Sequence, residues 1–136
     1  MAEIKWAESA HHLPIEAFSP NPKNPKKHTK KQLEHIRNSI LHFGFLDPIG
    51  VWGKEHVVVE GHGRMEALKQ LVQDGKIRIP AEGVPCIMLD HLSKRDRDAY
   101  MLEHNQSTME TPWDDDLLDD VLGDIADEGL DMEQFG

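Results

Sequence analysis

The sequence predicts a small α+β domain, in which a mixed sheet packs against helices and an acidic helix follows at the C-terminus. Two segments repeat apolar residues at helical spacing, and short β-branched runs lie between and beyond them. With 136 residues and 38% apolar content, the chain can build one hydrophobic core. We therefore expect one folded domain over residues 1–109 and an acidic helix or tail over 110–136, which would begin a linker if a further domain follows.

The first predicted elements are a strand, a proline-rich loop and a helix. Residues 12–18 alternate well enough for a short strand, and three prolines within 19–27 exclude regular structure there. Thr29 and Gln32 form a capping-box pattern, which starts a helix that Gly44 ends. The apolar positions of this helix recur at its period and are Leu33, Ile36, Ile40 and Phe43.

A hairpin and a second helix follow. The β-branched runs at 47–52 and 56–60 are separated by a glycine-containing turn, and the second run leads directly into Gly61. From Arg64 onward, apolar residues repeat at three- and four-residue intervals until Gly75. These residues are Met65, Ala67, Leu68, Leu71 and Val72.

The remaining elements are a strand and two helices. Residues 84–89 are predicted to form a strand, and Ser93 with Asp96 is predicted to cap the helix after it. Pro112 is expected at the first position of the last, acidic helix. Residues 129–136 are expected to be frayed or truncated, because no terminator closes their apolar pattern. The last helix is expected to bury its apolar residues, which are Trp113, Leu117, Leu118, Val121 and Leu122.

Charge is distributed unevenly along the chain, whose net charge is −10. Residues 110–136 hold eleven of the 25 acidic residues and no Lys or Arg, whereas residues 23–37 hold six Lys or Arg against the single acidic residue Glu34. The basic stretch would attract phosphate groups. The acidic end would be repelled by a nucleic-acid backbone, and we expect it to face solvent or a basic partner.

Composition also limits the class of protein. No run approaches the roughly eighteen apolar residues of a membrane helix, and the first residues lack a signal-peptide pattern, so we expect a cytoplasmic protein with no membrane partner. Cys86 is the only cysteine and is expected to be a small buried side chain. The nine histidines follow no metal-site spacing, and the aspartates of 114–120 are expected to form a solvated helix face.

The best candidate site is the turn Gly61-His62-Gly63-Arg64. A strand that passes at once into a helix leaves free backbone N–H groups at the helix start, where the macrodipole favours an anion. Gly61 and Gly63 allow close backbone approach, and Arg64 can grip phosphate oxygens with two N–H groups. His62 is a candidate general base or phosphate hydrogen-bond partner, because its unperturbed pKa lies near neutrality. The alternative is that the glycines only make a tight connection.

Four further blocks occur in a fixed order along the sequence, namely PNPKNPKKH (20–28), FGFLDPIGV (43–51), VEGHGRMEAL (59–68) and residues 92–105. Together they resemble the N-terminal domain of ParB proteins, in the ParB/sulfiredoxin superfamily. The likeness spans residues 12–116 and is greatest to ParB-like domains of phages and mobile elements that precede DNA methylases. It implies a ParB/sulfiredoxin-like fold.

The resemblance also implies a function. ParB domains of this type bind CTP with Mg²⁺, and the nucleotide state gates a clamp on DNA, so we expect a regulatory module that binds CTP or ATP with Mg²⁺. Its partners would be DNA or a DNA-modifying enzyme, in partition or DNA modification, and a homodimer is left open. The family's first motif maps onto Gly61, His62, Gly63, Arg64 and Ala67, and this chain keeps its glycine, last arginine and alanine. Because the Glu and first Arg of that motif are replaced here, phosphate binding is better supported than CTP specificity.

Further site residues follow from the same resemblance. Lys26 and His28 would line the phosphate pocket, or else belong to a solvated basic face. The family's second motif maps onto His104, Asn105 and Thr108, where its arginine is missing, and Asn105 is a candidate contact to the nucleotide or its metal. His104 stands where the family has an acidic residue that helps to hold Mg²⁺, a cation that prefers oxygen ligands.

Two other classes of function remain as alternatives. The first is an enzyme of the same fold, namely a nucleoside triphosphatase, a small-molecule kinase or a nuclease, although no acidic metal triad stands beside Gly61. The second is a protein-interaction domain with a degenerate pocket. Sulfiredoxin chemistry is excluded, because His62 occupies the position of the reactive cysteine in that family.

Overall fold

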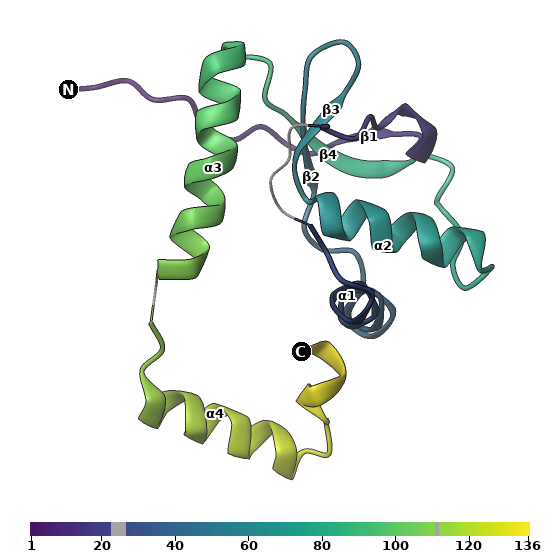
Figure 1. Cartoon of the computed structure of the whole chain (residues 1–136), viewed down its shortest axis with the longest axis vertical. Coiled ribbons are helices and arrows are strands. Elements are labelled where there is room, and N and C mark those ends of the chain that lie inside the picture. Colours follow the sequence, from purple (N-terminus) through teal and green to yellow (C-terminus); the bar gives the residue numbers. More distant parts are fainter. Residues whose placement is uncertain (23–26, 111) are drawn as a thin grey trace.

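The computed structural model of the chain describes residues 1–22, 27–110 and 112–136, with the helix but not the side chains described over 105–110. It confirms a mixed α+β architecture in which helices lie on a small sheet (Figure 1). In chain order the main elements are β1 (His11–Leu13), α1 (Lys30–Phe43), β2 (Ile49–Trp52), β3 (Val57–Glu60), α2 (His62–Gln73), β4 (Val84–Met88), α3 (Lys94–Glu110) and α4 (Asp115–Asp127).

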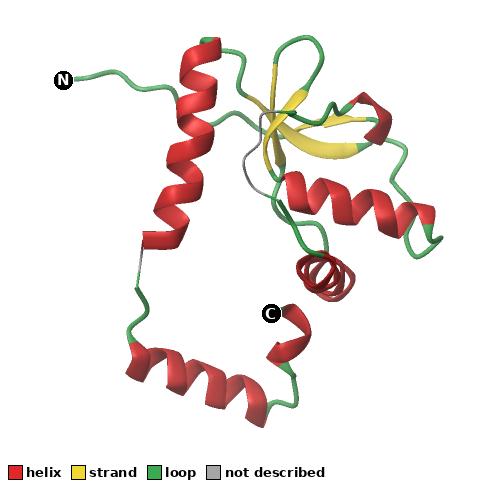
Figure 2. Cartoon of the chain, viewed as in Figure 1, coloured by secondary structure: helices red, strands yellow, loops and turns green. Residues whose placement is uncertain are grey.

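The sheet has four strands in the order β1-β4-β2-β3, seen in yellow in Figure 2. β4 runs antiparallel to β1 and parallel to β2, while β2 and β3 form the predicted antiparallel hairpin. Side chains of neighbouring strand residues point to opposite faces, so Val58 packs against α2 whereas Val59 packs against α3. The sheet therefore has α2 on one face and α3 on the other.

A second apolar layer packs α1 against α2, on the face of the sheet that α2 covers. Ala67 and Leu71 of α2 are fully buried against Ile40 of α1. Cys86 is also fully buried, as expected, and its burial raises the pKa of the thiol. No helix in the described parts of the chain is long and apolar enough to cross a membrane.

Local signals in the sequence set the limits of α1 and α3. The backbone N–H of Gln32 donates to Thr29 Oγ1 at 3.1 Å, and Thr29 N–H donates to Gln32 Oε1 at 2.9 Å, which completes the predicted capping box. Gly44 ends α1 with a φ of 105°. At the start of α3, Asp96 N–H donates to Ser93 Oγ at 3.1 Å.

The predicted first strand is only partly correct. Residues His11–Leu13 form β1, whereas Ile15–Ala17 form a 3₁₀ turn. The register pairs Leu13 with Val84, and Pro14, which has no backbone N–H, begins the departure from the ladder.

The start of the last helix was also predicted wrongly. α4 begins at Asp115, and Asp114 is its cap, because its carboxylate accepts the N–H of Leu117 at 3.2 Å. Pro112 therefore lies before the cap and not at the first helical position.

The expected burial of the last helix is wrong as well. α4 lies away from the sheet in Figure 1, and none of its residues is buried. Trp113 is 75% exposed, so it is no core anchor. The apolar side chains Leu117, Val121 and Leu122 are exposed too, because α4 has no layer of the domain to pack against.

The last residues are ordered where fraying was expected. A 3₁₀ turn, Met132–Phe135, follows α4 and packs on α1. Asn38 Nδ2 donates to the carbonyl of Gln134 at 2.9 Å, and the ring of Phe135 lies 4.9 Å from that of Phe43. These contacts attach the end of the acidic segment to the domain.

The α1–α2 layer leaves no space for a larger side chain at Ala67, which is 0% exposed. We expect Ala67→Leu to destabilise the domain by about 1–3 kcal/mol through overpacking, measured by thermal melting. Ala99→Leu, at an exposed position of α3, is the matched control and should melt close to the parent. Equal melting temperatures for Ala67→Leu and the parent would contradict the close packing.

Candidate functional site

The predicted turn joins β3 to α2 without a linker. Gly61 is the N-cap of α2 and has a φ of 96°, in the left-handed region that favours glycine. A Cβ atom at this position would lie 2.7 Å from Ile49 Cδ1, so the backbone also needs glycine for space. No side chain caps the helix, and the first N–H groups of α2 are therefore free of a side-chain partner.

His28 lies directly against this turn. A Cβ atom on Gly63 would be 2.8 Å from His28 Cε1 and 2.9 Å from His28 Nε2, so only glycine lets the imidazole approach. The structure thus brings together His28 and His62, which the sequence analysis assigned to one pocket. Lys26, the other residue predicted from this loop, lies outside the described residues.

A pocket of about 470 Å³ opens beside the turn. Its walls come from the loop before α1, from β3 and from the first turns of α2. They are lined by Pro20, Lys27, His28, Val58, His62, Met65, Glu66 and Lys69. This lining contains two lysines and two histidines but only one carboxylate, so the described wall favours an anionic ligand.

The sequence analysis missed Lys27, Glu66 and Lys69 as pocket residues. A usable signal was present, because Glu66 follows His62 by four residues and Lys69 follows Glu66 by three, which places all three on one face of α2. The approach of Lys27 to that face depends on how α1 packs, which the local pattern does not encode.

His62 is the most unusual side chain of the pocket. Its Nε2 atom is buried, and it is the one buried side-chain nitrogen or oxygen in the described part of the chain that has no hydrogen-bond partner. Burial lowers the pKa of His62, and the nearby His28 lowers it further. The imidazole is therefore held in its neutral form.

Arg64 makes contacts that the sequence did not predict. Its Nη1 donates to the backbone carbonyl of Asp47 and also lies 3.4 Å from the carbonyl of Pro48. Burial lowers the pKa of Arg64, while Asp47 and Glu60 raise it, and a guanidinium keeps its charge throughout. The side chain ties the loop before β2 to the start of α2, and its phosphate contact stays a prediction.

Ala67 serves the packing of the site. Its methyl group lies between α2 and Ile40 of α1 and does not line the pocket. A direct contribution of Ala67 to ligand binding stays a prediction.

On the other side of the turn, α3 contacts the last residue of β3. Tyr100 Oη donates to Glu60 Oε2 at 3.4 Å, and His104 Nε2 lies 3.4 Å from the same oxygen. Burial, and then the charge of Glu60, raise the pKa of Tyr100. His104 is thereby placed near the glycine turn, as the resemblance implied, whereas the side chain of Asn105 lies outside the described residues.

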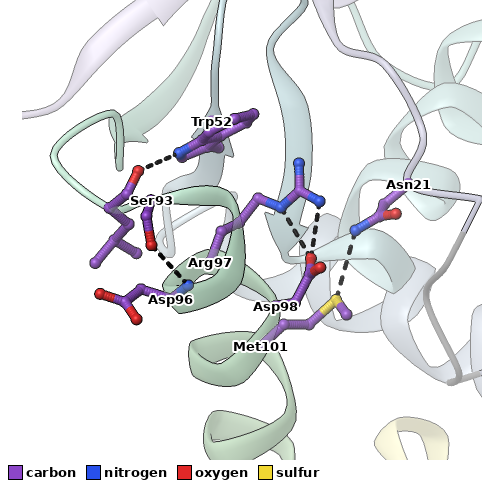
Figure 3. A network of polar contacts seen from close by, with 8 residues as sticks. Asn21, Trp52, Ser93, Asp96, Arg97, Asp98 and Met101 are labelled. Carbon is purple, nitrogen blue, oxygen red and sulfur yellow. Dashed lines mark hydrogen bonds and ion pairs between the residues drawn. The ribbon is translucent and has the colours of Figure 1, made fainter.

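A polar network holds α3 in this position (Figure 3). The guanidinium of Arg97 lies 4.6 Å above the ring of Trp52 in β2 and donates from Nη2 to Asp98 Oδ1 at 2.8 Å. Asn21 Nδ2 lies 3.7 Å from Met101 Sδ, which joins the loop before α1 to α3. Among the described residues, no group of three or more His, Cys, Asp or Glu is arranged to hold a metal ion.

Fold and site together define an α+β domain with an anion-favouring pocket at the uncapped start of a helix. Residues 2–105 match the model of the ParB N-terminal domain. The chain therefore belongs to the ParB N-terminal domain family, which confirms the resemblance. An association with phages or DNA methylases stays a prediction.

Two curated relatives agree with this assignment. The chain is 30% identical over 80 residues to the ParB-like nuclease domain-containing protein YnaK of Escherichia coli. This match covers 59% of this chain and 82% of YnaK. It is 36% identical over 62 residues to the probable chromosome-partitioning protein ParB of Campylobacter jejuni. That match covers 43% of this chain but only 22% of the longer protein.

Solved structures show the same fold at low identity. A C-terminally truncated ParB from Caulobacter crescentus, complexed with CTP-γ-S, matches 72% of this chain and 53% of its own, with 24% identity and a TM-score of 0.59. A Pnob8-like ParB-N domain matches 89% of this chain and 48% of its own, with 13% identity and a TM-score of 0.54.

The position of Arg64 beside the turn leads to a mutational prediction. We expect Arg64→Ala to weaken phosphate or nucleotide binding by about 1.5–3 kcal/mol, the worth of charge-assisted hydrogen bonds, as measured by calorimetry. Some stability should be lost as well, because the contacts with the Asp47 and Pro48 carbonyls disappear, so a melting curve must first show a folded variant. Arg78→Ala removes an exposed arginine outside this pocket and should bind like the parent. Unchanged affinity in folded Arg64→Ala would remove Arg64 from the site.

Proposed function

We propose that this chain is a nucleotide-binding regulatory module of a DNA-directed system, with the nucleotide phosphates in the pocket beside the glycine turn. The observation that carries the proposal is that Lys27, His28, His62 and Lys69 line one pocket, which lies beside the uncapped start of α2. Backbone N–H groups and cationic side chains at a helix start are the usual means of holding phosphate.

The relatives support a nucleotide as the ligand. The Caulobacter crescentus ParB of the same fold was solved with CTP-γ-S, so CTP is the first nucleotide to test. The pocket favours the phosphate groups over the base, because its described polar lining is mainly basic. We expect Mg²⁺ to arrive with the triphosphate, since this cation is commonly held by substrate phosphates together with few protein ligands.

The DNA link rests on the family. A relative is a probable chromosome-partitioning protein, and we propose that this chain also acts beside DNA, in partition or through a DNA-modifying enzyme. Nucleotide binding would control that action by favouring one arrangement of α3, which meets the glycine turn through Glu60 and Tyr100.

Calorimetric titration with CTP, ATP, GTP and UTP, each with Mg²⁺, tests the proposal. We expect binding of at least one nucleotide and a weakening of about 1–2 kcal/mol in Lys69→Gln, because one phosphate-facing cation is lost. Lys54→Gln changes an exposed lysine in the β2–β3 turn and is the matched control. Absence of binding for all four nucleotides to the folded parent would refute the proposed function.

The acidic segment allows a separate test of the DNA link. We expect deletion of residues 112–136 to reveal nonspecific DNA binding at low salt that fades as salt rises, because acidic groups no longer oppose the exposed Lys30 and Lys31 of α1. The deletion also removes Phe135 from α1, so a moderate fall in melting temperature is expected. Fluorescence anisotropy with a labelled duplex measures the binding.

A full-length control separates charge from truncation. Replacing Asp115, Asp116, Asp119 and Asp120 by Asn removes charge and leaves the 3₁₀ turn on α1. This variant should gain part of the same salt-dependent DNA binding. If neither folded variant gains affinity between high and low salt, the acidic segment does not screen the basic surface.

A further inference from the structure

One residue that lines the pocket carries a buried polar atom without a partner. His62 Nε2 is buried at the first residue of α2 and is the single such atom in the described part of the chain without a hydrogen bond. Buried polar atoms in native proteins are nearly always bonded to protein or water, so an exception in a pocket wall marks a position for a ligand or water atom. The neighbouring side chains indicate which ligand atom fits there.

Titratable and charged side chains line the pocket around His62 from two of the three described elements. Lys27 and His28 come from the loop before α1, Glu66 and Lys69 come from α2, and β3 contributes the apolar Val58. Arg64 lies in the same turn. Cationic groups therefore outnumber the single carboxylate, and the ligand opposite His62 Nε2 should carry negative charge.

These surroundings act on His62 differently in the empty and the filled pocket. Without a ligand, burial and His28 lower the pKa of His62, so its imidazole is neutral near neutral pH. A phosphate dianion close to Nε2 would reverse the balance, because an opposite charge stabilises the imidazolium.

We propose that His62 takes up a proton when a phosphate group binds and then donates a hydrogen bond from Nε2 to a phosphate oxygen. The pocket is thus a proton-linked site for a phosphate group of the ligand. The inference rests on the proposed function and deepens it, because it assigns the recognition of phosphate to the protonation of His62. It also implies that anions without a base or sugar bind here.

The sign of the pH dependence follows from linkage. Where His62 is neutral in the free protein and protonated in the complex, each binding event takes up a proton, so affinity rises as pH falls. The dependence disappears at higher pH, where His62 is neutral in both states, and at lower pH, where it is protonated in both.

Inorganic sulfate is a suitable probe, because its two charges do not change over the range in which histidine titrates. We expect the full chain to bind sulfate about tenfold more tightly at about pH 5.5 than at about pH 7.5. In an NMR titration of the imidazole signals, sulfate should raise the pKa of His62 and leave the signal of exposed His91 unchanged. Calorimetry in two buffers of different ionisation enthalpy should detect the proton uptake.

Three variants separate His62 from its neighbours. His62→Gln keeps a hydrogen-bond donor but cannot be protonated, so most of the pH dependence of sulfate binding should be lost, whereas His91→Gln should behave as the parent. His28→Gln retains His62 and should raise the pKa of His62 in the free protein, because a charge that lowers it is removed. This third variant provides a readout if His62→Gln does not fold.

The outcomes distinguish this inference from the proposed function. Equal pH dependence in parent and folded His62→Gln would overturn the role of His62, even if nucleotide binding persists. An unchanged His62 titration with saturating sulfate would overturn it as well. If the parent binds neither sulfate nor any nucleotide at any pH, both this inference and the proposed function fail.

Discussion

The close approach of backbone at Gly61 is the constraint on which the rest of the site depends. Its φ of 96° turns β3 directly into α2, and its missing Cβ makes room for Ile49 of the neighbouring strand. This geometry places His62, the first residue of α2, in the lining of the pocket and fixes the direction in which α2 leaves the sheet. It therefore determines both where His62 projects and which residues of α2 meet α1. A side chain at position 61 would be strained by the positive φ and would meet the side chains of Ile49 and Arg64.

The two faces of the sheet place different side chains on either side of the Gly61 turn. On the α2 face, the basic lining includes His28, which reaches Gly63 because that residue has no Cβ. On the α3 face, Glu60 accepts a hydrogen bond from Tyr100, while Arg97 holds α3 against Trp52. Glu60 and His62, the residues on either side of Gly61, thus belong to opposite faces: Glu60 contacts α3, and His62 lines the pocket on the α2 side.

Charge separation is the second organising feature of the molecule. The acidic residues of α4 surround an apolar stripe that the domain does not cover, and the final 3₁₀ turn attaches this segment to α1. α1 also carries exposed Lys30 and Lys31, so opposite charges are held within one molecule. Long-range attraction between them is screened by salt, whereas the Phe135 contact is not. Packing, more than charge, keeps the acidic segment near the domain.

The sequence by itself determined the features that neighbouring residues encode: the capping box at Thr29, the hairpin before Gly61, the burial of Cys86 and the family. Only the tertiary structure decided which side chains converge. The loop before α1 and a face of α2 meet because the helices pack through Ala67, which adds Lys69 to the pocket. The same packing leaves no layer for α4, so its helical apolar pattern is exposed despite resembling that of a buried helix. Periodicity specifies which face of a helix is apolar, but whether that face is covered depends on contacts between segments distant in the chain.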